Sequence, residues 1–366
     1  MKILIVSGIW PPDIGGPASH APDVARFLTE RGHDVRVVVT AETAPDTEPY
    51  PVHWIPRSLP KGVSHGVATV RIASAARQVD VVYATGMFAR TALAATAARR
   101  PFVLKLTGDP AFERARSRRR VGGDVESFQQ GGGGLESAVL RRVRDASLHA
   151  AAHVLCPSDF LRELAISWGV APERVSVLPN AIPLHPLLPE RSALRASFAI
   201  RGPTLAFAGR FAQQKSLEIL VGAVERVEGV SLLMAGDGDP PPAGGRVRLL
   251  GPLPRERVLE LFAASDAAVL SSSWENFPHS LVEALSVGTP VIATRVGGVP
   301  EIVEDGRNGL LVPPDDVEAF ADAIRRFFAD DELRARLAAA AAPSVERYRP
   351  ERIYGELEET LAKVVR

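Results

Sequence analysis

The chain has little cysteine, few aromatic residues and no surplus of charge. Cys156 is the single cysteine among 366 residues, so no disulfide can form within the chain and a reducing, cytoplasmic compartment is expected. Lysines and arginines number 43, as do aspartates and glutamates. Because nucleic-acid-binding proteins normally carry a basic excess, this balance argues against nucleic acid as a partner.

Long hydrophobic runs are absent as well. No stretch approaches the roughly 20 apolar residues that cross a membrane. The N-terminal run MKILIVSGIW stops at Pro11-Pro12-Asp13 without a small-residue cleavage site, which favours a buried first strand over a signal peptide. We therefore expect a soluble cytoplasmic protein, with contact to a membrane surface left open.

Short apolar, β-branched runs are abundant. They include KILIVS, VRVVVT, VVYAT, FVLKLT, HVLCPS and VSVLP in the first half, and TLAFAG, SLLMAG, VRLLG, AAVLSS, PVIATR and GLLVP in the second. Most are continuously apolar, which is typical of parallel strands covered on both faces. Amphipathic stretches such as DVARFLTERG and LEILVGAVERV lie between many of them. This alternation predicts doubly wound α/β sheets.

The chain of 366 residues, of which 46% are hydrophobic, is long enough and apolar enough to form two domains, each with its own hydrophobic core. The proline-rich, strandless segment 179–203 places the linker near residues 181 to 184, between domains 1–182 and 183–345. Residues 346–366 form a predicted helix with Ile353, Leu357 and Leu361 on one face. Ligands of such sheets bind beyond the carboxyl ends of the strands, so the site is expected in the cleft between the domains.

The segment Glu113 to Gly134, ERARSRRRVGGDVESFQQGGGG, departs from this pattern through its arginines and glycines. It is interpreted either as a solvated loop or as a lid that touches an acidic acceptor or an anionic membrane surface.

The stretch SSSWENFPHSLVEALSVGTPVIAT suggests a binding site. Glu275 follows a buried strand, and Pro278 fits the first turn of a helix, where its missing N–H costs nothing. The N–H groups of His279, Ser280 and Leu281 would then point at an anion, assisted by the helix dipole.

Glu283 lies about one turn inside that helix, where a carboxylate would repel a phosphate unless it faced hydroxyl groups. Glu283 could accept hydrogen bonds from the vicinal diol of a ribose, and Glu275 from the hydroxyls of a second ring. The alternative is that Glu283 makes a local cap or salt bridge and that Glu275 is merely exposed.

Two further turns carry candidate groups. In LAFAGRFAQQK, Gly209 and Arg210 end a strand and Lys215 begins a helix, so that the two cations could straddle a diphosphate or could be ordinary surface cations. In SGIWPPDIGGPASH, Gly15 and Gly16 permit close approach of a ligand. The spacing is not G-x-G-x-x-G, which counts against a nicotinamide enzyme.

His20 lies about one turn into the helix that follows these glycines. A lone histidine in a helix is more often structural than catalytic, so both interpretations of His20 stay open.

Taken together, these motifs resemble glycosyltransferase family 4, the retaining nucleotide-sugar transferases of GT-B fold. The resemblance covers most of the chain and rests on GGPASH, SDFLRELAISWGV, VSVLPNAI, GRFAQQK, LLMAGDG and, most specifically, ENFPHSLVEALSVGTPVIAT followed by GGVPEIVEDGRNGLLV. It implies two Rossmann-like domains with doubly wound parallel sheets facing across a cleft. The first would take the acceptor and the second the nucleotide sugar, and the C-terminal helix would cross back to the first.

The resemblance also implies roles. Arg210 and Lys215 would hold the donor diphosphate, Glu283 the ribose, and Glu275 would lie by the donor sugar. Backbone groups from Gly251 to Leu253 would take the base, and Gly16 would approach the phosphates. His20 matches the histidine that usually ends the first glycine motif.

Two departures from the family are visible. The usual E-x-F-G turn reads Glu275-Asn276-Phe277-Pro278, which removes one backbone donor to the phosphates. The family often has a histidine beside an aspartate after the fourth strand of the first domain, where this chain has Gly108 before Asp109. Asp109 is therefore a weaker candidate for positioning the acceptor.

The activity implied is transfer of a hexose, with retention, from a UDP- or GDP-linked donor to a hydroxyl of a small metabolite, glycan or lipid-linked acceptor. No cofactor or metal is expected, and Asp237-Gly238-Asp239 is interpreted as a turn. The alternatives are a nucleotide-sugar epimerase or phosphorylase of the same architecture, and a non-catalytic nucleotide-sugar binding module.

Overall fold

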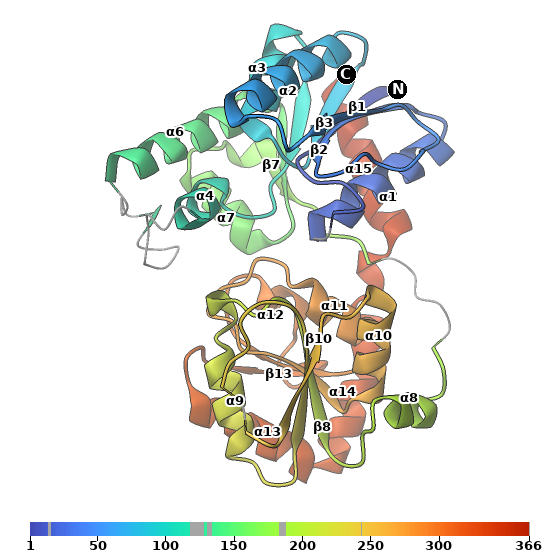
Figure 1. The fold of residues 1–366 in the computed structure, drawn as a ribbon, viewed down its shortest axis with the longest axis vertical. Coiled ribbons are helices and arrows are strands. Elements are labelled where there is room, and N and C mark those ends of the chain that lie inside the picture. The colour runs from blue at the N-terminus through green and yellow to red at the C-terminus, as the bar shows by residue number, and fades with distance from the viewer. Residues whose placement is uncertain (14–15, 118–127, 130–133, 183–187, 243, 366) are drawn as a thin grey trace. The chain divides into compact units, whose positions relative to one another are not determined.

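The computed structural model describes residues 1–13, 16–117, 128–129, 134–182, 188–242 and 244–365. The chain divides into two compact units, one formed by Met1–Ala181 with Glu351–Arg366 and the other by Ile182–Pro350. Figure 1 shows both units as sheets flanked by helices. Most of the arginine-rich segment, and residues 183–187 near the expected linker, lie outside the described residues.

The first unit holds a seven-stranded sheet in the order β3-β2-β1-β4-β5-β6-β7, and its strand pairs are parallel. Its strands are β1 (Lys2–Ser7), β2 (Asp34–Ala41), β3 (Val52–Pro56), β4 (Val81–Ala84), β5 (Phe102–Lys105), β6 (His153–Cys156) and β7 (Val175–Val177). Its helices are α1 (Gly16–Glu30), α2 (Lys61–Ala76), α3 (Phe88–Ala97), α4 (Pro110–Ser117), α6 (Gly134–Ala150), α7 (Asp159–Ser167) and α15 (Pro350–Val365).

The second unit holds a six-stranded parallel sheet in the order β10-β9-β8-β11-β12-β13. Its strands are β8 (Thr204–Ala208), β9 (Ser231–Ala235), β10 (Val247–Gly251), β11 (Ala267–Leu270), β12 (Val291–Thr294) and β13 (Gly309–Val312). Its helices are α8 (Arg191–Ser197), α9 (Leu217–Glu225), α10 (Arg255–Ala264), α11 (His279–Ser286), α12 (Val299–Ile302), α13 (Val317–Ala329) and α14 (Asp331–Ser344).

The predicted doubly wound parallel sheets are confirmed. In both sheets the winding reverses, between β1 and β4 in the first unit and between β8 and β11 in the second. Loops that leave the carboxyl ends of such a strand pair diverge to opposite sides, and ligands of this fold class bind between them. The segments that follow β1, β4, β8 and β11 are therefore the places to examine for function.

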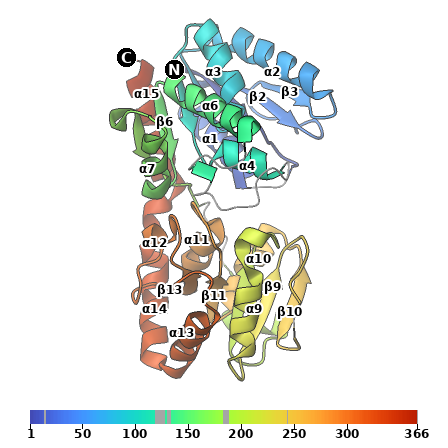
Figure 2. The same cartoon turned by 90° about the vertical axis from the view of Figure 1, so that its left-hand side faces the viewer.

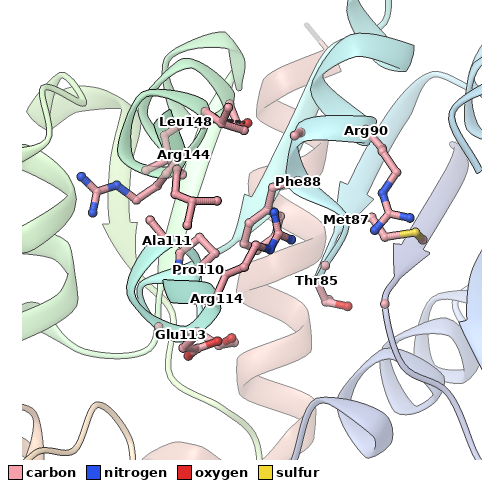
Figure 3. Close-up of a pocket in the computed structure, with 18 of the residues that line it drawn as sticks. Thr85, Met87, Phe88, Arg90, Pro110, Ala111, Glu113, Arg114, Arg144 and Leu148 are labelled. Atoms are coloured by element: carbon pink, nitrogen blue, oxygen red, sulfur yellow. Dashed lines mark hydrogen bonds between the residues drawn. The ribbon is translucent and has the colours of Figure 1, made fainter. Parts of the chain in front are cut away.

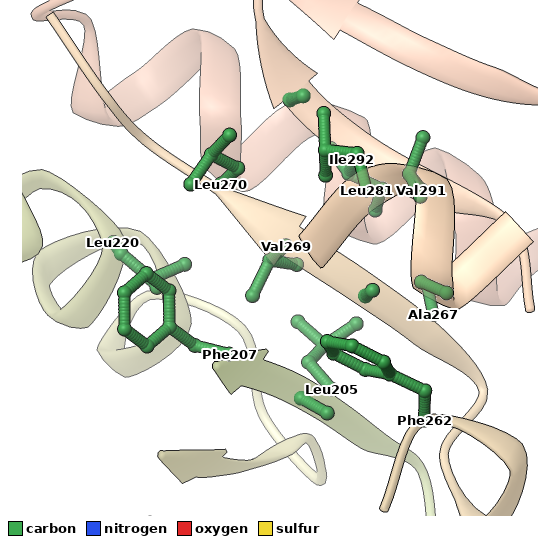
Figure 4. Packing of buried hydrophobic residues seen from close by; sticks show 14 of the residues in the cluster. Leu205, Phe207, Leu220, Phe262, Ala267, Val269, Leu270, Leu281, Val291 and Ile292 are labelled. Atoms are coloured by element: carbon green, nitrogen blue, oxygen red, sulfur yellow. The ribbon is translucent and has the colours of Figure 1, made fainter. Parts of the chain in front are cut away.

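The central strands are continuously apolar because helices cover both sheet faces. In the second unit, Phe207 of β8 and Val269 of β11 pack with Leu220 of α9 and Phe262 of α10 in one buried cluster. Figure 4 shows these side chains around the strands. Full burial of a side chain of this size contributes about 1.5 to 3 kcal/mol.

The strand β3 was not predicted from the sequence. It lies at the edge of the first sheet, and its two central residues, His53 and Trp54, are exposed. An edge strand with polar surroundings lacks the continuous apolar run by which the other strands were recognised.

The terminal helix α15 packs on the first unit, as predicted. Ile353, Leu357 and Leu361 are buried in the same cluster as Ile3 and Ile5 of β1. Figures 1 and 2 show α15 alongside the elements of this unit.

A polar contact fixes the same helix to the turn before β2. The carboxylate of Glu358 lies 2.8 Å from Nε2 of His33, and it accepts a hydrogen bond of 3.2 Å from Nε of Arg31. Across the described part of the chain, no helix has the length and apolar character needed to span a bilayer.

Candidate functional site

Lys215 and Glu275 meet beyond the carboxyl ends of β8 and β11. Lys215 ends the short 3₁₀ turn between β8 and α9, and Glu275 lies in the loop between β11 and α11. The ammonium of Lys215 donates to Oε1 of Glu275, and Oγ of Ser272 donates to the same oxygen over 2.7 Å. Only 19% of the lysine side chain and 8% of the glutamate side chain are exposed. The sequence predicted both residues at the site, but it did not predict their ion pair.

The two loops are joined by further hydrogen bonds. Nε2 of Gln214 donates to the carbonyl of Trp274 over 2.7 Å, and Oγ of Ser271 donates to the carbonyl of Lys215 over 2.7 Å. The backbone N–H of Ser273 donates to the carbonyl of Gln214 over 2.9 Å. These bonds hold the lysine and the glutamate in a fixed arrangement before any ligand arrives.

Arg210 behaves differently from Lys215. It is exposed, and within the described ranges it has no hydrogen bond or ion pair. Its neighbour Gly209 lies against Lys215, because a Cβ at Gly209 would be 4.0 Å from Cε of the lysine. A guanidinium without a partner among the described residues thus lies in the same loop as Lys215, and it is available to an anion.

Glu283 forms a second ion pair. Its Oε1 accepts a hydrogen bond of 2.7 Å from Nε of Arg255, the first residue of α10. Burial raises the pKa of Glu283 although the charge and hydrogen bond of Arg255 lower it. Nη2 of Arg255 is buried and has no partner among the described residues. Arg255 was not predicted from the sequence, because an arginine after Pro254 looks like any polar helix start.

The two carboxylates share one arrangement. In each, Oε1 accepts from a cation, Lys215 for Glu275 and Arg255 for Glu283. Among the described residues, no hydrogen bond or ion pair reaches the Oε2 atom of either carboxylate. Each glutamate can therefore accept hydrogen bonds from a hydroxylated ligand while its charge remains balanced.

The start of α11 corrects one expectation. Pro278 precedes the helix as its N-cap residue instead of occupying the first turn, and it provides no side-chain cap. The N–H of Leu281 donates to the carbonyl of Pro278 over 3.2 Å, so it is not available to an anion. Ser280 follows His279 in the first turn. The ring of Phe277 packs edge-on against Tyr348 at 5.4 Å and against His279 at 5.9 Å between centroids.

The loop expected to take a base begins at the end of β10. Gly251 has a φ of +71°, which favours glycine, and its carbonyl accepts a hydrogen bond of 2.9 Å from the N–H of Gly236. Leu253 packs against the core of the unit. These residues join the β10 end to the turn after β9, on the same edge of the sheet as Lys215.

The glycine motif of the first unit is partly described. Gly15 lies outside the described residues, and Gly16 begins α1. His20 is buried, with Nε2 2.8 Å from the hydroxyl of Tyr83 and its ring edge-on to Tyr83 and Tyr354. Burial raises the pKa of Tyr83 well above its usual value, with Tyr354 adding to the effect. The tyrosine hydroxyl therefore stays protonated, and His20 is part of a packed aromatic cluster.

Asp109 is also tied into the protein. Its side chain is 1% exposed and accepts hydrogen bonds from the N–H of Ala111 at 2.9 Å, Nε2 of Gln129 at 2.7 Å and Nη1 of Arg144 at 2.8 Å. Arg144 in turn lies 3.7 Å from the centroid of the Trp168 ring. Both oxygens of Asp109 are thus engaged in holding α4 and α6 together.

Glu113 lies against Gly108, the position at which the family resemblance implies a histidine. Its Oε1 lies where a Cβ at Gly108 would extend. Figure 3 shows Glu113 on α4 near Pro110. A carboxylate therefore takes up the space of the missing side chain, which the sequence did not indicate because Glu113 lies five residues further along.

Among the described residues, no three His, Cys, Asp or Glu side chains are grouped closely enough to hold a metal ion. In Asp237-Gly238-Asp239, Oδ1 of Asp237 accepts from the N–H of Gly238, as in a turn.

Comparison with known proteins gives the family. The model of glycosyltransferase family 4 matches residues 14–185, and that of glycosyl transferases group 1 matches residues 202–330. The D-inositol 3-phosphate glycosyltransferase of Mycobacteroides abscessus is 36% identical over 184 residues, which are 45% of this chain and 42% of that protein. The lipopolysaccharide core biosynthesis glycosyltransferase LpsE of Rhizobium meliloti is 38% identical over 146 residues, or 37% and 42% of the two chains. The chain thus spans about half the length of the curated relatives it matches, or less.

Solved structures match the fold of this protein over nearly its whole length. HepE of Anabaena, in complex with UDP and glucose, has a TM-score of 0.78 and 22% identity over 99% of this chain and 100% of its own. Sucrose-phosphate synthase of Thermosynechococcus elongatus has a TM-score of 0.77 and 19% identity over 100% of this chain and 99% of its own. With both halves of the chain matched by their models and both sheets wound as in these structures, this protein belongs to glycosyltransferase family 4 and has the GT-B fold.

Proposed function

We propose that the chain is a retaining hexosyltransferase that moves a sugar from a nucleoside diphosphate sugar to an acceptor hydroxyl. The observation that carries this proposal is the group of Arg210, Lys215 and Glu275 at the switch point of the second sheet. It combines a guanidinium that has no partner in the described part of the chain with a positioned ammonium and a carboxylate. A sugar diphosphate presents the complementary set of phosphate oxygens and hydroxyl groups.

The diphosphate would bind to the two cations. Lys215 gives one of its three N–H donors to Glu275, which leaves two, and none of the five N–H donors of Arg210 bonds to another described residue. As the bond from the sugar to the diphosphate breaks, negative charge grows on the departing oxygen. Fixed cations stabilise that charge more in the transition state than in the ground state, which lowers the barrier.

The two carboxylates would hold hydroxyl groups on either side of the diphosphate. Oε2 of Glu275 would accept from the donor sugar and Oε2 of Glu283 from the ribose. Because Arg255 balances Glu283 and Lys215 balances Glu275, neither glutamate adds an uncompensated charge next to the phosphates. In this arrangement Glu275 would also lie close to the reacting ring and would stabilise the positive charge that develops there.

A uridine donor is the first choice to test. Solved structures of HepE, which shares the fold, contain UDP or UDP-glucose. A GDP-linked donor is the second choice, and the acceptor is a hydroxyl of a metabolite, a glycan or a lipid-linked sugar. The proposed chemistry uses no metal or cofactor, so we expect activity to persist in EDTA.

The test is incubation of the purified chain with UDP-glucose or a GDP-sugar and a panel of acceptors. We expect a glycoside with the same anomeric configuration as the donor, assigned by proton NMR. Conversion of donor without acceptor would indicate an epimerase, and a requirement for inorganic phosphate would indicate a phosphorylase. Tight donor binding with no product from any acceptor would identify a binding module and contradict the proposal.

A further inference from the structure

The first unit has a surface cavity of about 410 Å³ at the edge of its sheet, between β3 and α2. Its wall comes from the first residues of β2, from the segment around His53, and from the last two turns of α2. Figure 2 shows α2 alongside β2 and β3. These elements all belong to the first unit, whereas Lys215 and Glu275 belong to the second, so the cavity is separate from the site described above.

Basic residues replace apolar ones on the sheet face that α2 covers. Val38 of β2 and Ile55 of β3 point to that face, because both are buried in one cluster with Ile72 of α2. Side chains alternate between the two faces of a strand, so Arg36 and His53 share the face of Val38 and Ile55. The strand pattern would place apolar residues at these two positions. Departures of this kind from the pattern are expected at functional sites.

Arg36 is held in place and still has unused hydrogen-bonding capacity. Its Nη1 donates to Oε1 of Gln78 over 2.5 Å, and its Nη2 lies 3.8 Å from Oδ2 of Asp34, which is too far for a hydrogen bond. Nε of Arg36 is buried and has no partner among the described residues. The guanidinium edge formed by Nε and Nη2 thus makes no hydrogen bond within the described part of the chain. Two donors side by side match two oxygens of a phosphate group.

The charge of the cavity wall is positive. Asp34 is the one carboxylate among the described lining residues, and it offsets the charge of Arg36. Arg71 and His53 are exposed, and neither has a hydrogen bond or ion pair to another described side chain. The carbonyls at the end of α2 contribute about half a negative charge, which is less than the full charge of Arg71. This wall therefore attracts an anion.

The size of the cavity and its other polar groups indicate what the anion carries. A volume of about 410 Å³ is more than a phosphate ion fills, and it falls within the roughly 300 to 1,000 Å³ of pockets for small molecules. The hydroxyl of Ser74, the amide of Gln78 and the carboxylate of Asp34 can all bond to hydroxyl groups. A sugar phosphate, or another phosphorylated polyol, presents both an anion and several hydroxyl groups.

We propose that this cavity binds a phosphorylated polyol, with the phosphate held by Arg36, His53 and Arg71 and the hydroxyl groups held by Asp34 and Ser74. Asp34 and Arg36 lie in the first three residues of β2, whereas ligands of a doubly wound sheet normally bind beyond the carboxyl ends of the strands. The phosphorylated polyol is therefore a ligand in addition to the donor and the acceptor of the proposed function, and its binding requires neither of them.

The experiment is calorimetric titration of the full chain, near neutral pH and at fixed ionic strength, with glucose 6-phosphate, inorganic phosphate and glucose. The variants are Arg71→Gln and, as a matched control, Arg77→Gln, because Arg77 is exposed at the end of α2 and does not line the cavity. Both positions are exposed, so both variants should fold. We expect glucose 6-phosphate to bind more tightly than inorganic phosphate and glucose not to bind. Arg71→Gln should weaken binding about tenfold or more, in line with loss of a charged hydrogen bond, and Arg77→Gln should leave it unchanged.

A second measurement locates the ligand, because cations elsewhere in the chain also attract phosphates. In protein that carries isotope-labelled histidine, the ring signal of His53 is the one that His53→Gln removes. Saturating glucose 6-phosphate should shift this signal in the wild type and much less at the same concentration in Arg71→Gln.

An unmoved His53 signal, an equal effect of Arg71→Gln and Arg77→Gln, or failure of both phosphate compounds to bind would overturn the site. Equal affinity for glucose 6-phosphate and inorganic phosphate would overturn the assignment to a polyol. Each of these outcomes leaves the proposed transferase activity intact, since that activity is tested with a nucleotide sugar and an acceptor.

Discussion

The ammonium of Lys215 and Oε1 of Glu275 form an ion pair between loops that are 60 residues apart in sequence. The pair exists because the winding of the second sheet places β8 next to β11, so that the loops after these strands leave adjacent carboxyl ends. Both groups that the proposed chemistry needs are therefore positioned before the donor binds, and each prevents the other from being buried as a lone charge.

Replacing one member of this pair should destabilise the fold. Lys215→Met leaves the carboxylate of Glu275 mostly buried with Ser272 as its remaining donor, and we expect a loss of about 3 kcal/mol in the free energy of unfolding. The double variant Lys215→Met/Glu275→Gln should regain part of the lost free energy of unfolding, because it no longer buries an uncompensated charge. Urea unfolding measures both, with the exposed Lys363→Met as control. An unfolding curve for Lys215→Met that matches wild type would contradict the structural role of the pair.

Arg210→Ala should leave the unfolding free energy unchanged, because Arg210 is exposed and has no partner among the described residues. Its turnover should fall at least about a hundredfold, since removing one fixed donor from a developing charge costs roughly 3 to 4 kcal/mol. Arg201→Ala, at another exposed arginine of the same unit, is the matched control for turnover. Near-normal turnover by Arg210→Ala would remove this residue from the site.

Glu283→Gln should weaken binding of UDP but have little effect on the 2′,3′-dideoxy analogue, which offers no diol to the carboxylate. Because burial raises the pKa of Glu283 despite Arg255, acidification neutralises this carboxylate sooner than an exposed one. Affinity for UDP should therefore fall as the pH drops, and the variant should lose that pH dependence. Titrations at several pH values test this, with the partly exposed Glu260→Gln of α10 as control. An equal loss of affinity for UDP and for the dideoxy analogue in Glu283→Gln would argue against contact between Glu283 and the ribose.

Lys105 gives a pH-dependent contribution to stability. It is fully buried in β5, donates to the carbonyls of Leu178 and Pro179, and has its pKa lowered to about 7 by desolvation. Between pH 7 and 9 the unfolded chain keeps this proton and the folded chain loses it. The free energy of unfolding should therefore rise with pH, by at most roughly 1.4 kcal/mol per pH unit from this group.

Lys105→Met tests this point, because the methionine has similar length and no charge. The slope of unfolding free energy against pH between 7 and 9 should be smaller in the variant than in wild type. Identical slopes would show that Lys105 does not change its protonation on folding.

Local sequence was enough for most strands. It also singled out Arg210, Lys215, Glu275 and Glu283 as candidates, because each lies within a few residues of a strand end or helix start that can be recognised. Their partners could not be recognised in this way. Arg255 meets Glu283 across 28 residues and Arg144 meets Asp109 across 35, because the order of the strands decides which loops touch. The strand β3 was missed for a different reason, since its exposed edge position removes the apolar run that marks a buried strand.

The return of α15 to the first unit has a consequence for biosynthesis. A growing chain exposes β1 long before α15, which packs in the same cluster as Ile3 and Ile5 and is translated only after the whole second unit. The apolar face that α15 covers must therefore stay open to chaperones until this 16-residue helix emerges. A nonsense mutation between the second unit and α15 would consequently damage the first sheet and spare the second.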